Sequence, residues 1–440
     1  MKKSGLVLIV LLVILIAVGW ISQLTGAVGK EQERSSYLKQ AAQYFEQELY
    51  QKAIECYNGA LGLKESLKTR VGWLQAYKEA YLDEAISLAE YTGALSEMCA
   101  RYPDEVGNWE ELLSIYVEQG DMNSAYDSYK DCDEAGVTSE VIRDFANKIL
   151  YSYNVTGRSC TDYIYNTNGS FTVFDGERWG VLDASGSTSY GYDYDYISPY
   201  GENGYALFTT EKGQRLMDKE GVIQAKIATK LEKTGAYSDG LLPICAENGQ
   251  WSYLDCASDT VALGAYEDAS NFSDGVAAVC KNGVWTLINA KGEAVCGTSF
   301  TDVKLHGNRD YFYDGVMIAA VNGVYGMYDA NGKALHSFAA QDMDIYMGGD
   351  VAYCDSNGKW GYVSAKGTVT LEAQYDEAKS FSNGIAAVSN GETWGFINTS
   401  GVLVIDYAFL RADYLTNAGT CMVSAADSQY NLLKLKFFNG

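Results

Sequence analysis

Side chains that commonly carry catalysis are scarce or scattered in this sequence of 440 residues. Only two histidines occur, His306 and His336, and no nucleophile signature lies near either, so a histidine-dependent triad has no support. Asp and Glu are so numerous that spacing selects no pair for glycoside hydrolysis. No phosphate loop or dinucleotide fingerprint occurs in its strand–helix context. The sequence therefore predicts no catalytic residue and no cofactor.

The cysteines give no metal-site pattern either. None forms Cys-x-x-Cys, and no histidine follows at zinc spacing, so we expect no bound metal. Most are expected to be small buried hydrophobes. In an oxidising compartment, two pairs could instead form disulfides, Cys245 with Cys256 or Cys280 with Cys296. The ten cysteines are Cys56, Cys99, Cys132, Cys160, Cys245, Cys256, Cys280, Cys296, Cys354 and Cys421.

One tyrosine-rich run is a candidate ligand face. Between residues 190 and 196 every second residue is tyrosine, with Gly or Asp between. In a strand, this period of two places the tyrosines on one face and the acids on the other. An exposed aromatic face suits sugar rings or peptide side chains, whereas burial of the same face in a core is the alternative. The candidate ligand residues are Tyr190, Tyr192, Tyr196 and Tyr200.

The charge balance restricts the partners. There are 57 acidic and 33 basic residues, for a formal net charge of −24. Such a surface repels phosphate polymers and anionic headgroups, and no basic stripe offsets it. We therefore expect a protein or peptide partner, with a glycan as the alternative and no nucleic acid.

A repeat dominates the last two-thirds of the chain. A leading glycine recurs eight times, and an anchor residue, usually aromatic, follows it by ten or eleven residues. A fixed period of this length is typical of a repeat architecture. The leading glycines are Gly169, Gly204, Gly240, Gly275, Gly315, Gly349, Gly384 and Gly419, and the anchors are Trp179, Arg215, Trp251, Trp285, Tyr325, Trp360, Trp394 and Tyr430.

Each unit contains three β-type runs separated by Asn-Gly, Lys-Gly or Ser-Gly, which favour turns. In five units a second aromatic lies fifteen residues after the anchor: Tyr194, Tyr266, Phe300, Tyr375 and Phe409. Large rings at fixed places most simply stack between neighbouring units. We therefore interpret the anchors as structural.

Over residues 160–440 the pattern resembles the bacterial WG-repeat family, named for the pair found at Trp179-Gly180, Trp360-Gly361 and Trp394-Gly395. The resemblance implies a β-repeat structure and no activity. Departures from the pair occur in five units. The second unit, with Arg215-Leu216, departs most.

The two ends of the repeat region indicate a closed ring. The last unit, from Gly419, stops after two strands, while residues 161–169 match the end of the first full unit. The N-terminal piece could therefore supply the strand that the last unit lacks, giving an eight-bladed β-propeller, which protects sheet edges. An open β-solenoid is the alternative.

Residues 35–150 show a helical period and form an all-α domain in this prediction. Tyr37, Ala41 and Tyr44 lie on one helix face, and Ala53, Tyr57 and Ala60 lie on the next. The phrase Tyr50-Gln-Lys-Ala-Ile resembles the start of a tetratricopeptide helix, and it returns at Leu82 and, more loosely, after Trp109, with an insertion over 91–106. This resemblance implies docking of a peptide or protein. A rigid helical stalk is the alternative.

An apolar run precedes these helices. Residues 5–24 approach the length of a transmembrane helix, and Lys2 and Lys3 before it favour a cytoplasmic N-terminus over residues 1–4. A cleaved signal peptide is the alternative. We expect a single-pass cell-membrane protein whose helical domain (35–150) and β-domain (155–440) lie outside the cytoplasm.

Together these patterns predict a non-enzymatic, membrane-anchored interaction scaffold of a bacterial cell envelope. The alternatives are a cell-wall or glycan-binding protein and a glycan-active hydrolase built on a propeller.

Overall fold

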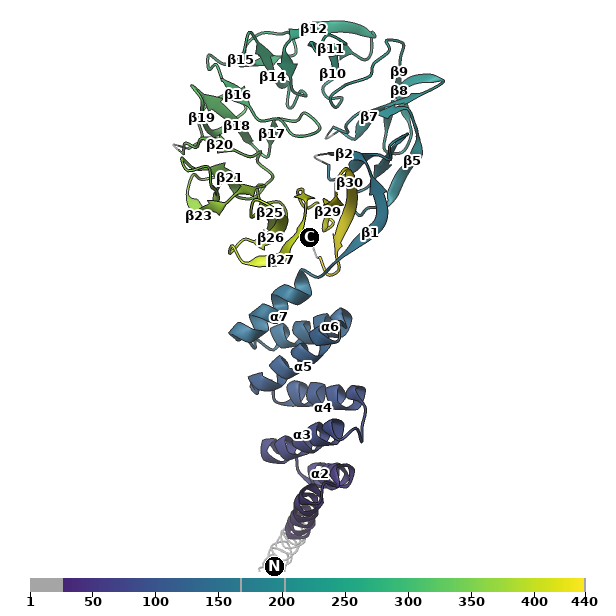
Figure 1. Cartoon of the computed structure of the whole chain (residues 1–440), viewed down its shortest axis with the longest axis vertical. Coiled ribbons are helices and arrows are strands. Elements are labelled where there is room, and N and C mark those ends of the chain that lie inside the picture. Colours follow the sequence, from purple (N-terminus) through teal and green to yellow (C-terminus); the bar gives the residue numbers. More distant parts are fainter. Residues whose placement is uncertain (1–26, 167, 202, 337, 439–440) are drawn as a thin grey trace, which may run out of the picture. The chain divides into compact units, whose positions relative to one another are not determined.

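The computed structural model describes residues 27–166, 168–201, 203–336 and 338–438. The chain divides into two compact units, with the boundary between Ile149 and Leu150. Described residues of the first unit are helical, and those of the second form β-sheets (Figure 1). The predicted anchor over 5–24 and the segment before it lie outside the described residues. Within the described part, no helix is both long and apolar enough to cross a membrane.

Capping side chains set several helix ends in the first unit. Ser66 accepts the Thr69 N–H at the start of α3, and Ser87 forms a reciprocal capping box with Glu90 at the start of α4. Asp121 caps α6 through the Ser124 N–H. After a helical segment over 27–46, the helices are α2 (Tyr50–Leu63), α3 (Leu67–Leu82), α4 (Leu88–Arg101), α5 (Val106–Glu118), α6 (Met122–Glu134) and α7 (Glu140–Leu150).

Small residues allow these helices to pack closely. Ala53, Ala76 and Ala80 are fully buried in one core with Trp73. A Cβ on Gly59 would lie 2.9 Å from the Tyr37 ring, so glycine lets that ring pack closely here. The first helical segment and α2 are separated by a break over residues 47–49.

The predicted insertion over 91–106 is wrong, because most of it is α4. Tyr91, Leu95 and Met98 are buried along one face of that helix. The phrase at Leu82 likewise starts no helix, since α3 ends there and Ser87 caps the next one.

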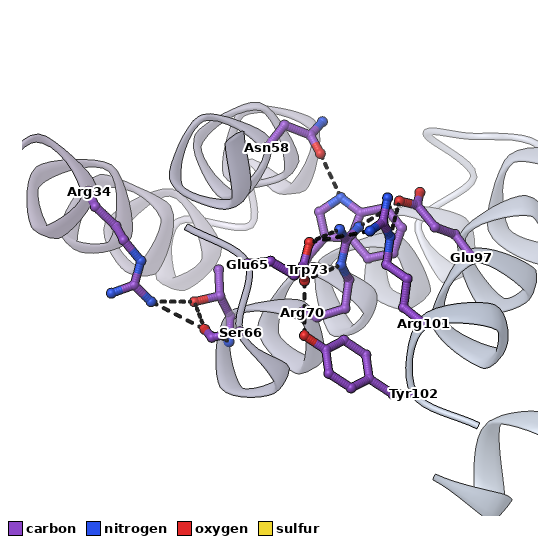
Figure 2. A network of polar contacts seen from close by, with 10 residues as sticks. Arg34, Asn58, Glu65, Ser66, Arg70, Trp73, Glu97, Arg101 and Tyr102 are labelled. Carbon is purple, nitrogen blue, oxygen red and sulfur yellow. Dashed lines mark hydrogen bonds and ion pairs between the residues drawn. The ribbon is translucent and has the colours of Figure 1, made fainter. Parts of the chain in front are cut away.

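A polar network joins α3 to α4 (Figure 2). The buried Arg70 guanidinium forms ion pairs with Glu65 at 2.6 Å and Glu97 at 3.1 Å and lies 4.5 Å above the Trp73 ring. Arg101 donates to Glu97 at 3.0 Å, and Tyr102 donates to Glu65 at 3.1 Å. Because every charge here has an opposite partner, the network fixes helix packing.

The second unit contains eight antiparallel sheets arranged in a ring, which confirms the eight-bladed propeller (Figure 1). Most sheets have four strands, because a short inner strand follows the second aromatic and precedes the three runs seen in the sequence. The first sheet contains β2 (Asp162–Tyr165), β3 (Phe171–Phe174), β4 (Trp179–Leu182) and β5 (Thr188–Tyr194). The second contains β6 (Tyr196–Ile197), β7 (Tyr205–Thr210), β8 (Gly213–Asp218) and β9 (Ile223–Ile227). The third contains β10 (Leu241–Cys245), β11 (Trp251–Asp255) and β12 (Thr260–Tyr266), and the fourth contains β13 (Asp268–Ala269), β14 (Val276–Lys281) and β15 (Val284–Asn289).

The remaining sheets complete the ring. The fifth contains β16 (Asp302–Val303), β17 (Phe312–Tyr313), β18 (Val316–Val321) and β19 (Val324–Tyr328). The sixth contains β20 (Asp342–Met343), β21 (Val351–Cys354), β22 (Trp360–Val363) and β23 (Val369–Tyr375). The seventh contains β24 (Glu377–Ala378), β25 (Ile385–Ser389), β26 (Trp394–Asn398) and β27 (Leu403–Phe409). The eighth contains β28 (Arg411–Ala412), β29 (Thr420–Ala426), β30 (Gln429–Leu435) and β1 (Tyr153–Cys160).

The eighth sheet contains both ends of the repeat region. Strand β1 pairs with β30, with Tyr153 opposite Leu435 and Cys160 opposite Tyr430. The predicted closure is therefore correct, but the closing strand is 153–160 rather than 161–169. Residues Asp162–Tyr165 form the inner strand of the first sheet instead.

The cores lie between sheets. Each apolar cluster of this unit draws mainly on two consecutive sheets, and the eighth sheet packs on both the seventh and the first. Examples are Phe396 with Leu433 and Phe171 with Met422. This packing closes the ring and stabilises short strands that could not fold alone.

Strand register explains the fifteen-residue spacing. Trp360 lies opposite Tyr375, and Trp394 lies opposite Phe409, so each second aromatic is the cross-strand partner of its anchor. The outer strand bulges between the ring pair and the next paired residues. There a Cβ on Gly361 or Gly395 would lie 2.6 Å from main-chain atoms. The Trp-Gly pair is therefore one device, a ring beside a glycine that accommodates the bulge.

Two units without the Trp-Gly pair also agree with this link between a glycine and a bulge in the outer strand. In the third sheet Ser252 follows the anchor, and the glycine has moved to the facing strand, where a Cβ on Gly264 would lie 2.6 Å from the Ser252 Cβ. In the fourth sheet the strand facing Thr286 is reduced to isolated bridges. No bulge crowds the backbone there.

The leading glycines mostly occupy turns. Asp274 and Gly275, with φ of 51° and 78°, form a two-residue turn between Ser273 and Val276. The sixth unit differs, because Gly348 rather than Gly349 has positive φ. Gly349 is required for close approach instead, since a Cβ there would lie 2.7 Å from Phe381.

Candidate functional site

The main candidate site is a cavity of about 890 Å³ at the centre of the ring, called here the central cavity. Its lining comes from the inner strands and following residues of the first, fifth, sixth, seventh and eighth sheets. Trp360, Trp394 and Tyr430, all anchors, also line it and are half-buried. Anchors here therefore combine a structural role with an accessible aromatic surface.

The inner strands place charges of both signs on the cavity wall. Lys304 pairs with Asp342 at 2.8 Å and lies 4.6 Å from the centre of the Tyr325 ring. Glu377 and Arg411, at equivalent places in neighbouring sheets, are exposed. The wall therefore offers carboxylate and guanidinium groups to a ligand beside the aromatic rings.

Deeper in the cavity, two carboxylates are held by tyrosines. Tyr414 donates its hydroxyl to Asp344 at 2.8 Å, and Tyr163 donates to Asp413 at 2.9 Å. Burial raises the pKa of Asp413, and the Lys379 ammonium offsets part of that increase. Burial alone would lower the pKa of Lys379, but nearby carboxylates, first Asp344, raise it above its usual value.

A loop over residues 304–311, called here the central loop, leaves the fifth sheet and crosses the ring. Arg309 donates to Ala269 O at 2.7 Å, pairs with Asp268 and lies 3.7 Å from the centre of the Trp251 ring. Near the other end of the loop, His306 Nε2 lies 3.2 Å from Met347 Sδ. One loop thus contacts sheets on both sides of its own, the third and fourth on one side and the sixth on the other.

His306 lies among the rings of Tyr165 and Tyr414, with centroids 5.4 and 5.8 Å away. Burial lowers its pKa to about 4, although nearby Asp310 and Asp344 oppose the shift. It is therefore neutral at physiological pH.

A second cavity of about 720 Å³ is lined by Tyr165, Met347 and the turns that carry the leading glycines. Tyr165 lines both cavities, so the layer of His306, Tyr165 and Met347 separates them.

The candidate tyrosines do not form one exposed face. Tyr190 packs on Phe208, with ring centroids 4.8 Å apart, whereas Tyr192 belongs to a different core and lies beneath Arg158. The bulge in β5 breaks the period-two alternation between them. Tyr196 accepts the Thr234 N–H at 3.0 Å, and Tyr200 is 2% exposed. Tyr200 is therefore buried, whereas Tyr190, Tyr192 and Tyr196 are half-buried and do not share one face.

Other predicted residues occupy structural places. Trp251 and Trp285 are buried between sheets, while His336 is exposed. All ten cysteines are free, so neither Cys245–Cys256 nor Cys280–Cys296 is joined. Within the described residues, no three His, Cys, Asp or Glu side chains gather as a metal site.

Sequence reasoning missed the central loop and the inner strands. The loop had a signal, because the spacing from Gly275 to Gly315 is 40 residues while the others are 34 to 36. An insertion in one repeat of a ring extends from a fixed place and can reach the centre. The inner strands are two residues long in most sheets, too short for a period to register.

The comparisons agree with the repeat. A family model described as WG containing repeat matches residues 264–285 and 360–394, so the chain carries WG repeats. Among solved structures, the chain is similar to BamB from Moraxella catarrhalis, with 12% identity, a TM-score of 0.41 and coverage of 64% of this chain and 100% of that chain. Comparison with curated proteins gives no match.

Proposed function

We propose that this protein is a non-enzymatic interaction scaffold of a bacterial cell envelope, anchored through residues 5–24, whose central cavity holds a segment of a partner protein. The observation that carries the proposal is the cavity itself. It has a volume of about 890 Å³ and offers half-buried rings beside charges of both signs. Rigid surfaces of this kind suit extended peptide segments, because aromatic anchors supply contact area and charges set the register.

The charge of the chain indicates the kind of segment. The cavity lining contains five carboxylates and three basic side chains, apart from His306: Asp342, Asp344, Glu377, Glu392 and Asp413 against Lys304, Lys379 and Arg411. With a net charge of −24 for the whole chain, a basic segment is attracted at long range.

Catalysis is not part of the proposal. The two deep carboxylates accept hydrogen bonds from tyrosines. One observation favours a hydrolase as the second candidate. Asp413 has a raised pKa, as a general acid requires, and Asp344 lines the same cavity. If Asp413→Asn abolished hydrolysis of a wall glycan by the folded protein, that result would overturn the scaffold proposal.

The direct test compares variants of the full chain in mild detergent, each offered the envelope proteins and the purified wall glycan of its own cells. Trp360→Ala removes a lining ring, and Glu392→Lys reverses an exposed charge in the lining. Asp427→Lys makes the same charge change at an exposed site outside the lining and is the matched control.

We expect specific proteins to be retained by the wild type and by Asp427→Lys and lost from the other two variants. Retention of glycan alone, lost with Trp360→Ala, would instead support the cell-wall-binding alternative. Protease added to intact, wall-stripped cells tests the location, since an extracytoplasmic propeller is cleaved there. The tetratricopeptide-like character of the helical unit, and its docking role, remain predictions.

A further inference from the structure

A third cavity, of about 690 Å³, lies at the anchor end of the second sheet and is called here the anchor-gap cavity. Its lining includes Trp179, Tyr196, Gln214, Ile227 and Leu231, and it shares no lining residue with the central cavity. It is a separate place on the propeller.

Register shows why this cavity exists. In the sixth sheet Asp342 pairs with Cys354, which pairs with the anchor Trp360. In the second sheet the equivalent path runs from Tyr196 through Thr209 to Gln214. Gln214 therefore occupies the anchor place, and the sequence-based assignment of Arg215 is wrong by one residue. The second unit is the only one of the eight without an aromatic anchor.

The buried Gln214 side chain is bound to the loop that follows β9. Its amide donates to Leu231 O at 2.7 Å and accepts the Leu231 N–H at 2.9 Å. Both bonds fix the loop over 228–232, which follows β9 and forms one wall of the anchor-gap cavity. Hydrogen bonds of Gln214 therefore hold one wall of the cavity in place.

The lining indicates what fits. The half-buried Trp179 ring meets Tyr196 edge to face at 6.0 Å, and Ile227 and Leu231 provide apolar surface beside it. A planar ring entering here would contact Trp179 and Tyr196 beside this apolar surface. Because the other seven units have an aromatic anchor, an aromatic occupant is expected here.

Charges around the cavity indicate the neighbours of that ring. Three carboxylates, Asp195, Glu211 and Glu232, face one lysine, Lys230. Lys230 pairs with Glu232 at 2.7 Å and Arg178 pairs with Asp195. The balance stays negative, so basic residues beside the entering ring are complementary.

We propose that the anchor-gap cavity receives an aromatic side chain of a partner protein, flanked by lysine or arginine, in the place that the repeat's own ring takes elsewhere. This proposal deepens the proposed function and rests on it, because the occupant belongs to a bound protein.

The test measures binding of a fluorescent peptide, acetyl-Lys-Trp-Lys-amide, to the full chain by polarisation. Gln214→Trp fills the space with the missing ring, and Trp179→Ala removes the stacking surface. We expect each to weaken binding about tenfold, while Trp360→Ala in the central cavity leaves it within about twofold. Circular dichroism confirms that each variant is folded, and acetyl-Lys-Ala-Lys-amide is expected not to bind.

Other outcomes overturn the inference. Weakening by Trp360→Ala but not by Gln214→Trp would place the peptide in the central cavity, so the inference would fail while the proposed function stood. Equal binding of the alanine peptide, or displacement of the tryptophan peptide by a wall oligosaccharide, would also contradict it. If the central-cavity variants retain envelope proteins but Gln214→Trp loses them, the role of the central cavity fails and the inference stands.

Discussion

The sixth and second sheets are built from the same repeat and differ at one place. In the sixth, Trp360 faces Tyr375, and Gly361 admits a bulged outer strand. In the second, Gln214 faces Ile227 and Arg215 faces Lys226 without a register shift, so neither a ring nor a glycine is needed. Between these two sheets, the ring, the glycine after it and the register shift at that place are lost together. A propeller can therefore lose one anchor and gain a cavity without losing its sheet.

The strongest way to break this comparison is to place alanine after the anchor position in each sheet. Gly361→Ala puts a Cβ 2.6 Å from Leu371 O and Ala373 N, and we expect a loss of about 3 kcal/mol in unfolding free energy. Arg215→Ala, at the equivalent place in the second sheet, is expected to cost less than about 0.5 kcal/mol. Denaturant unfolding followed by circular dichroism measures both. Equal losses would show that the bulge does not explain the glycine.

The fifth sheet departs from the repeat through its central loop. The dependence of stability on pH tests the burial of His306 in that loop. The folded-state pKa of His306, about 4, lies below its usual value of 6.5. Between these two pH values the folded protein therefore binds fewer protons than the unfolded chain. The unfolding free energy therefore falls as pH decreases, by about 2 kcal/mol between pH 6.5 and 5.

His306→Gln is expected to remove this component, and His336→Gln, at an exposed histidine, to leave it unchanged. The measurement is the difference between each variant's pH–stability curve and that of the wild type. A curve for His306→Gln that stays parallel to the wild type across the window would show that the histidine is not buried in the neutral form.

A smaller effect sharpens the comparison within the third sheet, where the glycine has changed strands. Gly264→Ala brings a Cβ within 2.6 Å of the Ser252 Cβ. Combined with Ser252→Gly, the same change removes the clash, so we expect a favourable coupling of about 1–2 kcal/mol in a double-mutant cycle. Additive single effects would mean that the two strands do not share one steric requirement.

The sequence predicted much of the fold because its signals were periodic. Eight glycines and anchors at a fixed spacing gave the units, and the incomplete last unit indicated ring closure. Errors arose where the chain departs from the regular spacing or alternation by one residue. Spacings of ten and of eleven residues both occur between the leading glycine and the anchor, so spacing placed the second anchor at Arg215 instead of Gln214. The bulge in β5 separated Tyr190 from Tyr192.

The candidate sites were not predictable in the same way. The central cavity brings together residues from distant parts of the chain, such as Tyr163 in β2 and Asp413 just after β28, which no local pattern connects. The anchor-gap cavity depends on a ring that is absent, and an absence is visible only once register shows where the ring belongs.

The most direct measurement is a crystal structure of the full chain with acetyl-Lys-Trp-Lys-amide bound. Our account predicts the peptide's indole against Trp179 and above Gln214, with a lysine directed toward Glu211. An indole in the central cavity, on the helical unit or in the cavity lined by the leading-glycine turns would contradict the claim that the missing anchor makes the binding site.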